Sequence, residues 1–406
     1  MQKYSVGLRW FYGAQPVFCG MKDFFSRIAA SFTANRLAVS LMFLTNGFIY
    51  ANWAARIPAI QARFGLDDRL LGLALLAISI GALVAMPFAG WIIVRFGSRR
   101  TTTVSALLFT GVVPFIALVP VWWQLLIVFV GIGICTGILD VAMNAQAVVV
   151  EQRMGRPIMS SFHAIFSGGM VLGALMGAWF TALPYPLWVN LAVVGGTGMA
   201  MVLYGIRHLV ADTPAAASEE GAGGFQWPAP ALIGLGVIAC CCMLGEGSMA
   251  DWTTKYMQEV VAAPEVLAPI GLGAFSAAMM LGRILGDAAR TRLGDRRLMI
   301  GGGAVATLGL GAALLWPVPL VAIAGFFAVG LGLATIVPIA YATAGNTPGL
   351  APGVGIGMVT TIGYAGFLLG PAVIGFLSDS WGLRPALGFV LVLLTGMTLL
   401  GTRVRT

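Results

Sequence analysis

The sequence has little charge of either sign. Only 9% of its 406 residues are charged, while 59% are hydrophobic, against about 25% charged residues in an ordinary soluble domain. A soluble globule of this length would need a far more polar exterior. The composition therefore argues against the soluble enzyme classes.

Motifs for catalysis and metal binding are also missing. Lys3, Lys22 and Lys255 are the three lysines, and none follows the glycine-rich loop of ATP-binding proteins. The two histidines form no His-Glu-x-x-His motif. The consecutive cysteines 240–242 would point about 100° apart on a helix, so they cannot converge on one metal ion. We expect a non-enzyme with no catalytic residues, no metal and no cofactor.

Long apolar runs are what the sequence has instead. A helix that spans a bilayer needs about 20 apolar residues, and twelve runs of this kind are separated by short polar or Pro/Gly segments. The 55 glycines suit close helix packing in a membrane. We predict an all-α membrane protein with twelve transmembrane helices. The runs are 35–58, 69–94, 101–121, 123–150, 158–183, 186–208, 229–256, 267–290, 298–317, 319–344, 353–378 and 384–402.

The spans divide into two bundles of six. A cytoplasmic segment, 1–34, precedes the first bundle at 35–209, and a linker at 210–228 leads to the second at 229–406. Most of the 23 basic residues fall on one side of the predicted membrane, and cytoplasmic loops are rich in Lys and Arg. We therefore expect both termini in the cytoplasm of an inner (plasma) membrane protein. The net charge of +8 then reports topology and does not indicate a nucleic-acid partner.

The two bundles resemble each other at an offset of 197 residues, which matches Gly97 to Gly294. The first helix of each bundle fits at an offset of 199, which aligns the Trp-containing segment 51–56 with residues 250–255. Six helices repeated in the same orientation are the plan of many secondary transporters. Further matched pairs are Arg99 with Arg296, Arg100 with Arg297, Gly133 with Gly330 and Gly169 with Gly366.

The segment 90–100 looks like the signature between helices 2 and 3 of the major facilitator superfamily, with Val94 in place of the usual acid. With the twelve spans and the repeat, the chain resembles that superfamily over nearly its whole length. The segments 139–146 and 160–163 resemble a poorly characterised bacterial inner-membrane branch, loosely similar to fucose-permease-type symporters. The resemblance implies two halves that rock about a central site, lined by helices 1, 4, 7 and 10. It also implies a gating role for arginines of the signature loop, which are Arg95, Arg99 and Arg100.

Two acids lie deep within predicted spans, Asp140 in the fourth and Glu246 in the seventh, near the position that aligns with Asn46. An ionised side chain at that depth costs several kcal/mol unless it is paired or faces water. A carboxylate that takes a proton from one side and releases it to the other would couple transport to protons. His163, at the start of the fifth helix, is a third candidate for proton coupling. The alternatives are structural: acids hydrogen-bonded to a neighbouring helix, and a helix-end histidine.

Asn46, Tyr50 and Trp53 share one face of the first helix, which suits a small polar solute with one apolar side. The alternative is helix packing together with an interfacial tryptophan belt. Further candidates for solute binding are Asn144, Tyr341 and Tyr364.

Charged residues near the span ends are candidates for gating. Arg56, at the outer end of the first helix, is expected either to snorkel to the membrane surface or to pair with an acid such as Asp251 across the halves. Asp251 and Lys255 are spaced i, i+4 and are also expected to pair with each other. Arg283 and Asp287 have the same spacing, and we expect an ion pair that steadies the inner gate.

The function predicted from these features is proton-coupled symport of a small polar organic solute by alternating access. One alternative is a proton-driven efflux antiporter for amphipathic compounds, because 19 methionines and 11 tryptophans could line an adaptable pocket. Another is a membrane sensor that binds a ligand without transport. The expected partners are a small-molecule substrate, protons and the lipid bilayer, and the protein is expected to be a monomer.

Overall fold

The computed structural model describes residues 33–155, 158–211, 230–345 and 352–403. Within them the chain is a bundle of long helices, and 12 of these are long and apolar enough to cross a membrane. The predicted all-α fold with twelve spans is therefore confirmed. Residues 1–32 of the expected N-terminal segment, and most of the predicted linker at 210–228, lie outside the described residues.

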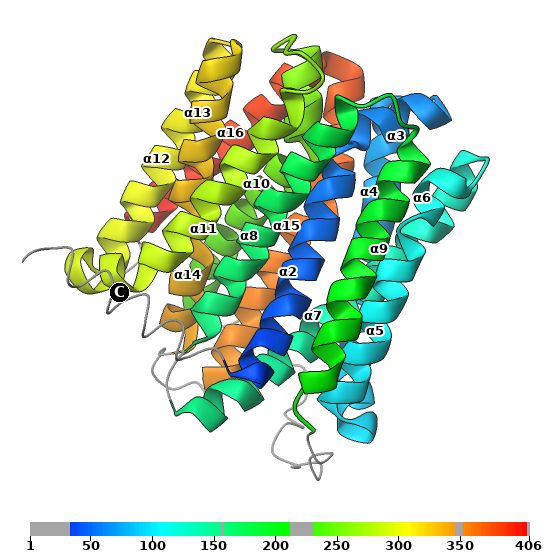
Figure 1. Cartoon of the computed structure of the whole chain (residues 1–406). Helices are drawn as coiled ribbons and strands as arrows, with labels where there is room; N and C mark the ends of the chain where they lie inside the picture. Colours follow the sequence, from blue (N-terminus) through cyan, green and yellow to red (C-terminus); the bar gives the residue numbers. More distant parts are fainter. Residues whose placement is uncertain (1–32, 156–157, 212–229, 346–351, 404–406) are drawn as a thin grey trace, which may run out of the picture.

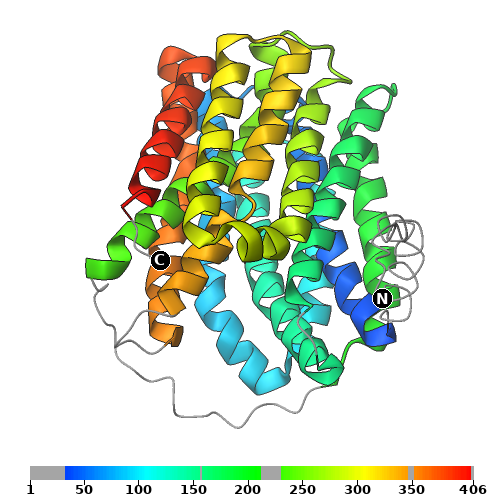
Figure 2. The same cartoon turned by 90° about the vertical axis from the view of Figure 1, so that its left-hand side faces the viewer.

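The two halves stand side by side in Figure 1, the first coloured blue to green and the second yellow-green to red. In Figure 2 the yellow helices of the second half face the viewer. The helices of the first half are α2 (Ala34–Ala55), α3 (Ile57–Phe64), α4 (Asp68–Phe96), α5 (Ser98–Val112), α6 (Phe115–Leu118), α7 (Trp122–Met154), α8 (Met159–Thr181) and α9 (Leu187–Gly205). Those of the second are α10 (Pro230–Glu259), α11 (Ala268–Leu293), α12 (Asp295–Leu315), α13 (Pro319–Leu333), α14 (Ile336–Gly345), α15 (Pro352–Trp381) and α16 (Leu383–Gly401).

Two details of the helices were not predicted. The short helix α3 lies in what was expected to be a loop, and the third and tenth spans are each broken into two helices. Prolines explain both breaks, since a proline ring clashes with the carbonyl four residues earlier and lacks an N–H. Pro114 stands between α5 and α6. Pro338 lies four residues after Ala334, which is in the break between α13 and α14.

The bundle has two chemically distinct ends. We call one the basic end, where α4 meets α5 and α11 meets α12. The other is the Lys255 end, where α10 finishes beside α3, at the top of Figure 1. The arginines of the basic end are Arg95, Arg99, Arg100, Arg153, Arg207, Arg290, Arg292, Arg296 and Arg297.

The internal repeat is visible in the turns at the basic end. Gly97 has φ 82° and ψ 153°, and its match Gly294 has φ 76° and ψ 157°. These positive φ values favour glycine. The backbone N–H of each donates to the residue four positions earlier, Ile93 and Arg290, at 2.8 and 2.9 Å. The same turn therefore joins the second and third spans of each half.

The first helices follow a different register from the predicted one. A Cβ on Gly169 of α8 would lie 2.3 Å from the Leu44 carbonyl oxygen, and one on Gly366 of α15 would lie 2.2 Å from that of Cys240. Leu44 and Cys240 are thus equivalent, at an offset of 196. The predicted offset of 199 is wrong. It aligned similar residues near the ends of the two helices, whereas the close backbone contacts in the middle of each helix determine which residues are equivalent. Glu246 is therefore equivalent to Tyr50 and not to Asn46.

Candidate functional site

A cavity of about 300 Å³ lies between the two halves. It is lined by α2, α4, α7 and α8 of the first half and by α10, α11 and α15 of the second. Most of its surface is apolar, with methionines and aromatic rings from both halves. The methionines and phenylalanines of this surface are Met86, Met170, Met279, Phe166, Phe275 and Phe367.

The aromatic and amide stripe of α2 faces this cavity. Asn46, Tyr50 and Trp53 all line it, as does Tyr364 of α15. The rings of Tyr50 and Trp53 pack edge to face with centroids 5.2 Å apart. The Tyr50 hydroxyl donates to a carboxylate oxygen of Asp251 at 3.0 Å, which links α2 to α10 across the two halves.

Asp140 lines the cavity from α7. It accepts a hydrogen bond from the Asn144 side chain, whose Nδ2 lies 3.3 Å from Asp140 Oδ1 and 2.8 Å from the Asp140 carbonyl oxygen. Asn144 is not among the lining residues. Its role in the structure is to hold the carboxylate of Asp140, one helical turn away.

Glu246 of α10 and Arg283 of α11 form an ion pair at the cavity wall. Arg283 Nη2 lies 3.6 Å from Glu246 Oε2, and Arg283 Nη1 donates to Ser167 Oγ of α8 at 2.9 Å. Arg283 thus contacts both halves. The expected partner, Asp287, has a side chain that lies outside the described residues, and the structure pairs Arg283 with an acid of another helix.

Other predicted site residues lie away from the cavity lining. His163 packs edge-on against the ring of Phe43, with centroids 5.4 Å apart. The Tyr341 hydroxyl lies 4.0 Å from the Met243 sulfur. Arg56 donates to the Thr181 hydroxyl of α8, and Asp251 accepts from Tyr50. The expected pair of Arg56 and Asp251 is therefore not among the ion pairs of the described residues.

The arginines of the signature loop stay at the basic end. The guanidinium of Arg95 lies 5.4 Å from the ring centroid of Trp91 and 5.5 Å from that of Phe96. Arg99 and Arg100 lie in the first turn of α5. Val94, in the position of the usual acid, is 41% exposed.

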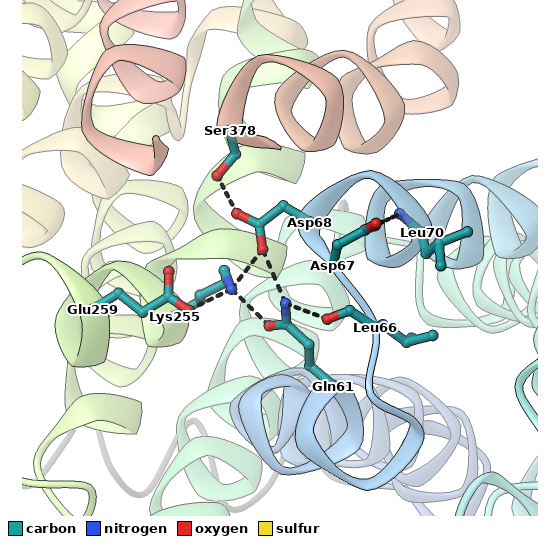
Figure 3. A network of polar contacts seen from close by, with 8 residues as sticks. All are labelled: Gln61, Leu66, Asp67, Asp68, Leu70, Lys255, Glu259 and Ser378. Atoms are coloured by element: carbon teal, nitrogen blue, oxygen red, sulfur yellow. Dashed lines mark hydrogen bonds and ion pairs between the residues drawn. The ribbon is translucent and has the colours of Figure 1, made fainter. Parts of the chain in front are cut away.

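A polar network joins the halves at the Lys255 end (Figure 3). The Lys255 ammonium lies 2.7 Å from Asp68 Oδ1, 2.7 Å from Gln61 Oε1 and 2.5 Å from Glu259 Oε1. Asp68 also accepts from Gln61 Nε2 at 2.9 Å and from the Ser378 hydroxyl. Lys255 is only 2% exposed. We call this set the Lys255 network: Gln61, Asp68, Lys255, Glu259 and Ser378.

The Lys255 network corrects the expected pair of Asp251 and Lys255. Lys255 lies one turn nearer the helix end, where α3 and α4 of the other half supply Gln61 and Asp68, while Asp251 stays at the cavity with Tyr50. The backbones are also close there, since a Cβ on Gly72 of α4 would lie 2.8 Å from the Pro371 carbonyl oxygen. A lone lysine at the end of an apolar helix was the available signal, but its partners could not be read from spacing.

Known proteins agree with this architecture. Residues 38–371 match the family profile of the Major Facilitator Superfamily. An uncharacterised MFS-type transporter from Yersinia pestis is 34% identical over 364 residues, which cover 89% of this chain and 93% of the relative. The resemblance to a poorly characterised bacterial branch is thereby confirmed.

Solved structures share the fold at low identity. A mutant of the nucleoside transporter NupG aligns with a TM-score of 0.75 at 11% identity, over 92% of this chain and 100% of that one. A bacterial homologue of the human lysosomal transporter Spinster, in an inward-facing and occupied conformation, aligns with a TM-score of 0.67 at 15% identity, over 92% and 97%. The profile match, the relative and the twelve spans lead to one conclusion: the chain belongs to the major facilitator superfamily of membrane transporters.

Proposed function

We propose that this transporter carries a small organic solute together with protons by alternating access. The observation that supports symport is the set of carboxylates in the central cavity, where Asp140, Glu246 and Asp251 all line the space between the halves. Among the described residues, Glu246 has an arginine partner, whereas Asp140 and Asp251 form no ion pair. A carboxylate at membrane depth without a cation is best accommodated when it binds a proton.

The proposed orientation places the basic end in the cytoplasm, together with both termini, as the excess of Lys and Arg favours. The Lys255 network and the close contact of α4 with α15 then close the outer side. The described form is, on this proposal, the inward-facing one. Transport requires the Lys255 network to break so that the halves can rock about the cavity.

Asp140 and Glu246 are the proposed proton carriers. Asp140 accepts from a neutral amide, so it can exchange its proton without losing an ion pair. Glu246 faces Arg283 at 3.6 Å, so its protonation state sets the charge beside the solute. His163 packs against Phe43 outside the cavity lining, and we leave it out of the proposed proton path.

Proteoliposomes loaded with the pH-sensitive dye pyranine test the proposal. Solutes that raise the melting temperature of the purified protein are added outside, and symport is expected to acidify the lumen. Asp140→Asn and Glu246→Gln should each reduce acidification to the level of protein-free liposomes, because neither variant can exchange a proton at that position. Asp379→Asn, which removes an exposed aspartate outside the cavity, should retain it. Unchanged acidification in both cavity variants would rule out coupling through these acids.

A second candidate function is proton-driven efflux of amphipathic compounds. The methionine and aromatic lining of the cavity favours it, since such side chains adapt to varied apolar bodies. The same assay separates the two functions by sign. Antiport would make the lumen more alkaline when solute is added outside, whereas symport makes it more acidic.

A further inference from the structure

We infer that the transported solute is an amphipathic organic anion whose carboxylate binds Arg283 and whose apolar body lies among the methionine and aromatic side chains of the cavity. This inference rests on the proposed function, and it names the class of solute. The steps below concern the arginine, its acidic partner and the surrounding surface.

Arg283 is the only Lys or Arg among the described residues that line the cavity. A guanidinium has five N–H donors in a planar fork that matches a carboxylate. One of them donates to Ser167 Oγ, while the approach of Nη2 to Glu246 at 3.6 Å exceeds hydrogen-bond length. Arg283 is 21% exposed. The guanidinium is therefore reachable from the cavity and has donors left for the oxygens of a ligand.

Glu246 controls whether Arg283 is available. When Glu246 is ionised, the two side chains form the ion pair that the structure shows. A proton on Glu246 removes the negative charge, and a solute carboxylate can then take its place beside the guanidinium. One proton and one anion enter together, so the net charge of the cavity stays the same. The halves can then rock without an additional uncompensated charge, which would be costly in a low-dielectric site.

Several other titratable groups share this environment. They are Cys242 and Asp251 on the helix of Glu246, Tyr50 of α2, Asp140 of α7, His163 of α8 near Arg283, Tyr341 of α14 and Tyr364 of α15. Asp140 and Asp251, which form no ion pair among the described residues, are the groups that could favour a cationic solute instead. A cation bound there would share the cavity with the Arg283 guanidinium and be repelled by it, which is why we favour the anion.

Apolar surface adjoins the guanidinium. Met279 precedes Arg283 by one turn of α11, and Phe166 and Met170 flank Ser167 on α8, so both helices present apolar groups beside the polar contact. All three line the same cavity. A solute with a carboxylate at one end and a hydrocarbon body at the other fits this arrangement.

Binding of matched probes to the purified full-length protein tests the inference. The probes are 3-phenylpropanoate and hexanoate, each compared with its neutral amide and with the corresponding amine, so that only the head group changes. Isothermal titration should detect the two carboxylates in preference to the amides and amines. Binding should tighten as the pH falls, because the proposed exchange takes up a proton at Glu246. Glu246→Gln should bind the carboxylates with little dependence on pH.

Arg283→Gln should weaken carboxylate binding by about tenfold to a hundredfold, since charge-assisted hydrogen bonds are lost. Arg290→Gln is the matched control: it removes an arginine of the same helix that pairs with Asp295 at 2.7 Å, outside the cavity, and it should bind normally. Arg283→Lys keeps the charge without the fork and should give an intermediate affinity, which separates recognition from misfolding.

Two results would overturn the inference: no carboxylate binding by the native protein, or binding of the amines through Asp140 in preference. The outcome is separable from that of the proposed function. Carboxylate binding without lumen acidification would uphold the inference and reject symport. Acidification of the lumen by the neutral amides alone would support symport and reject the inference of an anionic solute.

Discussion

Replacing Lys255 by methionine is expected to open the Lys255 end of the bundle. Lys255 is 2% exposed and holds Asp68, which is 15% exposed, together with Glu259 of its own helix. Removing one partner of a buried ion pair costs about 3–5 kcal/mol, because the other charge stays buried without compensation. Asp68 belongs to the first half and Lys255 to the second, so this cost falls on the closed arrangement and is relieved when the halves separate.

Distances between nitroxide labels on the two halves measure the effect. Arg63→Cys on α3 and Glu265→Cys after α10 place labels at exposed positions on opposite halves of the Lys255 end, in a background without the native cysteines. The Lys255→Met variant should shift the population toward longer distances. A distance distribution identical to that of the parent protein would show that the Lys255 network does not hold this end closed.

Two further variants separate charge compensation from general damage. Arg69→Gln removes an exposed arginine that stacks on the Phe376 ring, 5.0 Å from its centroid, and so also links α4 to α15. Its effect should be about 1 kcal/mol or less, as for other exposed charges. Combining Lys255→Met with Asp68→Asn should restore part of the closed population, since no unpaired charge is then buried.

The sequence predicts the spans well because membrane depth is a local property. A run of about 20 apolar residues suffices to identify a spanning helix, whatever its neighbours are. The turn at Gly97 and its repeat at Gly294 also depend on a local property, because glycine adopts a positive φ most easily. The stripe of Asn46, Tyr50 and Trp53 on α2 required only the helical period, and the three residues do line one cavity.

Charge pairing was not predictable, because it depends on which helices meet. Spacing within one helix suggested that Lys255 pairs with Asp251 and that Arg283 pairs with Asp287. In the structure Lys255 pairs with Asp68 of another helix as well as with Glu259 of its own. Arg283 faces Glu246 of another helix, while the side chain of Asp287 lies outside the described residues. The partners from other helices follow from the packing of the helices. Lys255 also bonds to Gln61 of the short helix α3, which no apolar run predicts. The expected solute-binding role of Asn144 changed in the same way, since its amide holds Asp140.

Gly133→Ala is expected to destabilise the protein by about 3 kcal/mol, the upper part of the usual range for overpacking. A Cβ at this position of α7 would lie 2.0 Å from the carbonyl oxygen of Ile78 in α4. The contact is with backbone, so no side-chain rotation relieves it and the two helices must separate. Gly330, its match in the second half, has the same relation to Phe275, at 2.3 Å from the carbonyl oxygen, and Gly330→Ala should have a similar effect.

Gly131→Ala is the control on the same helix. Its Cβ would meet only Val112 Cγ2, at 3.9 Å, and alanine favours a helix over glycine by about 1 kcal/mol, so this variant should melt at or above the parent temperature. Equal melting temperatures for Gly131→Ala and Gly133→Ala would show that α4 and α7 are not packed as described. The close contact matters for function because Asp140 lies two turns after Gly133 on α7, while Ile78 itself lines the cavity from α4. Separating the two helices should therefore displace the proposed proton carrier as well, and Gly133→Ala should lose proton coupling even at temperatures where it stays folded.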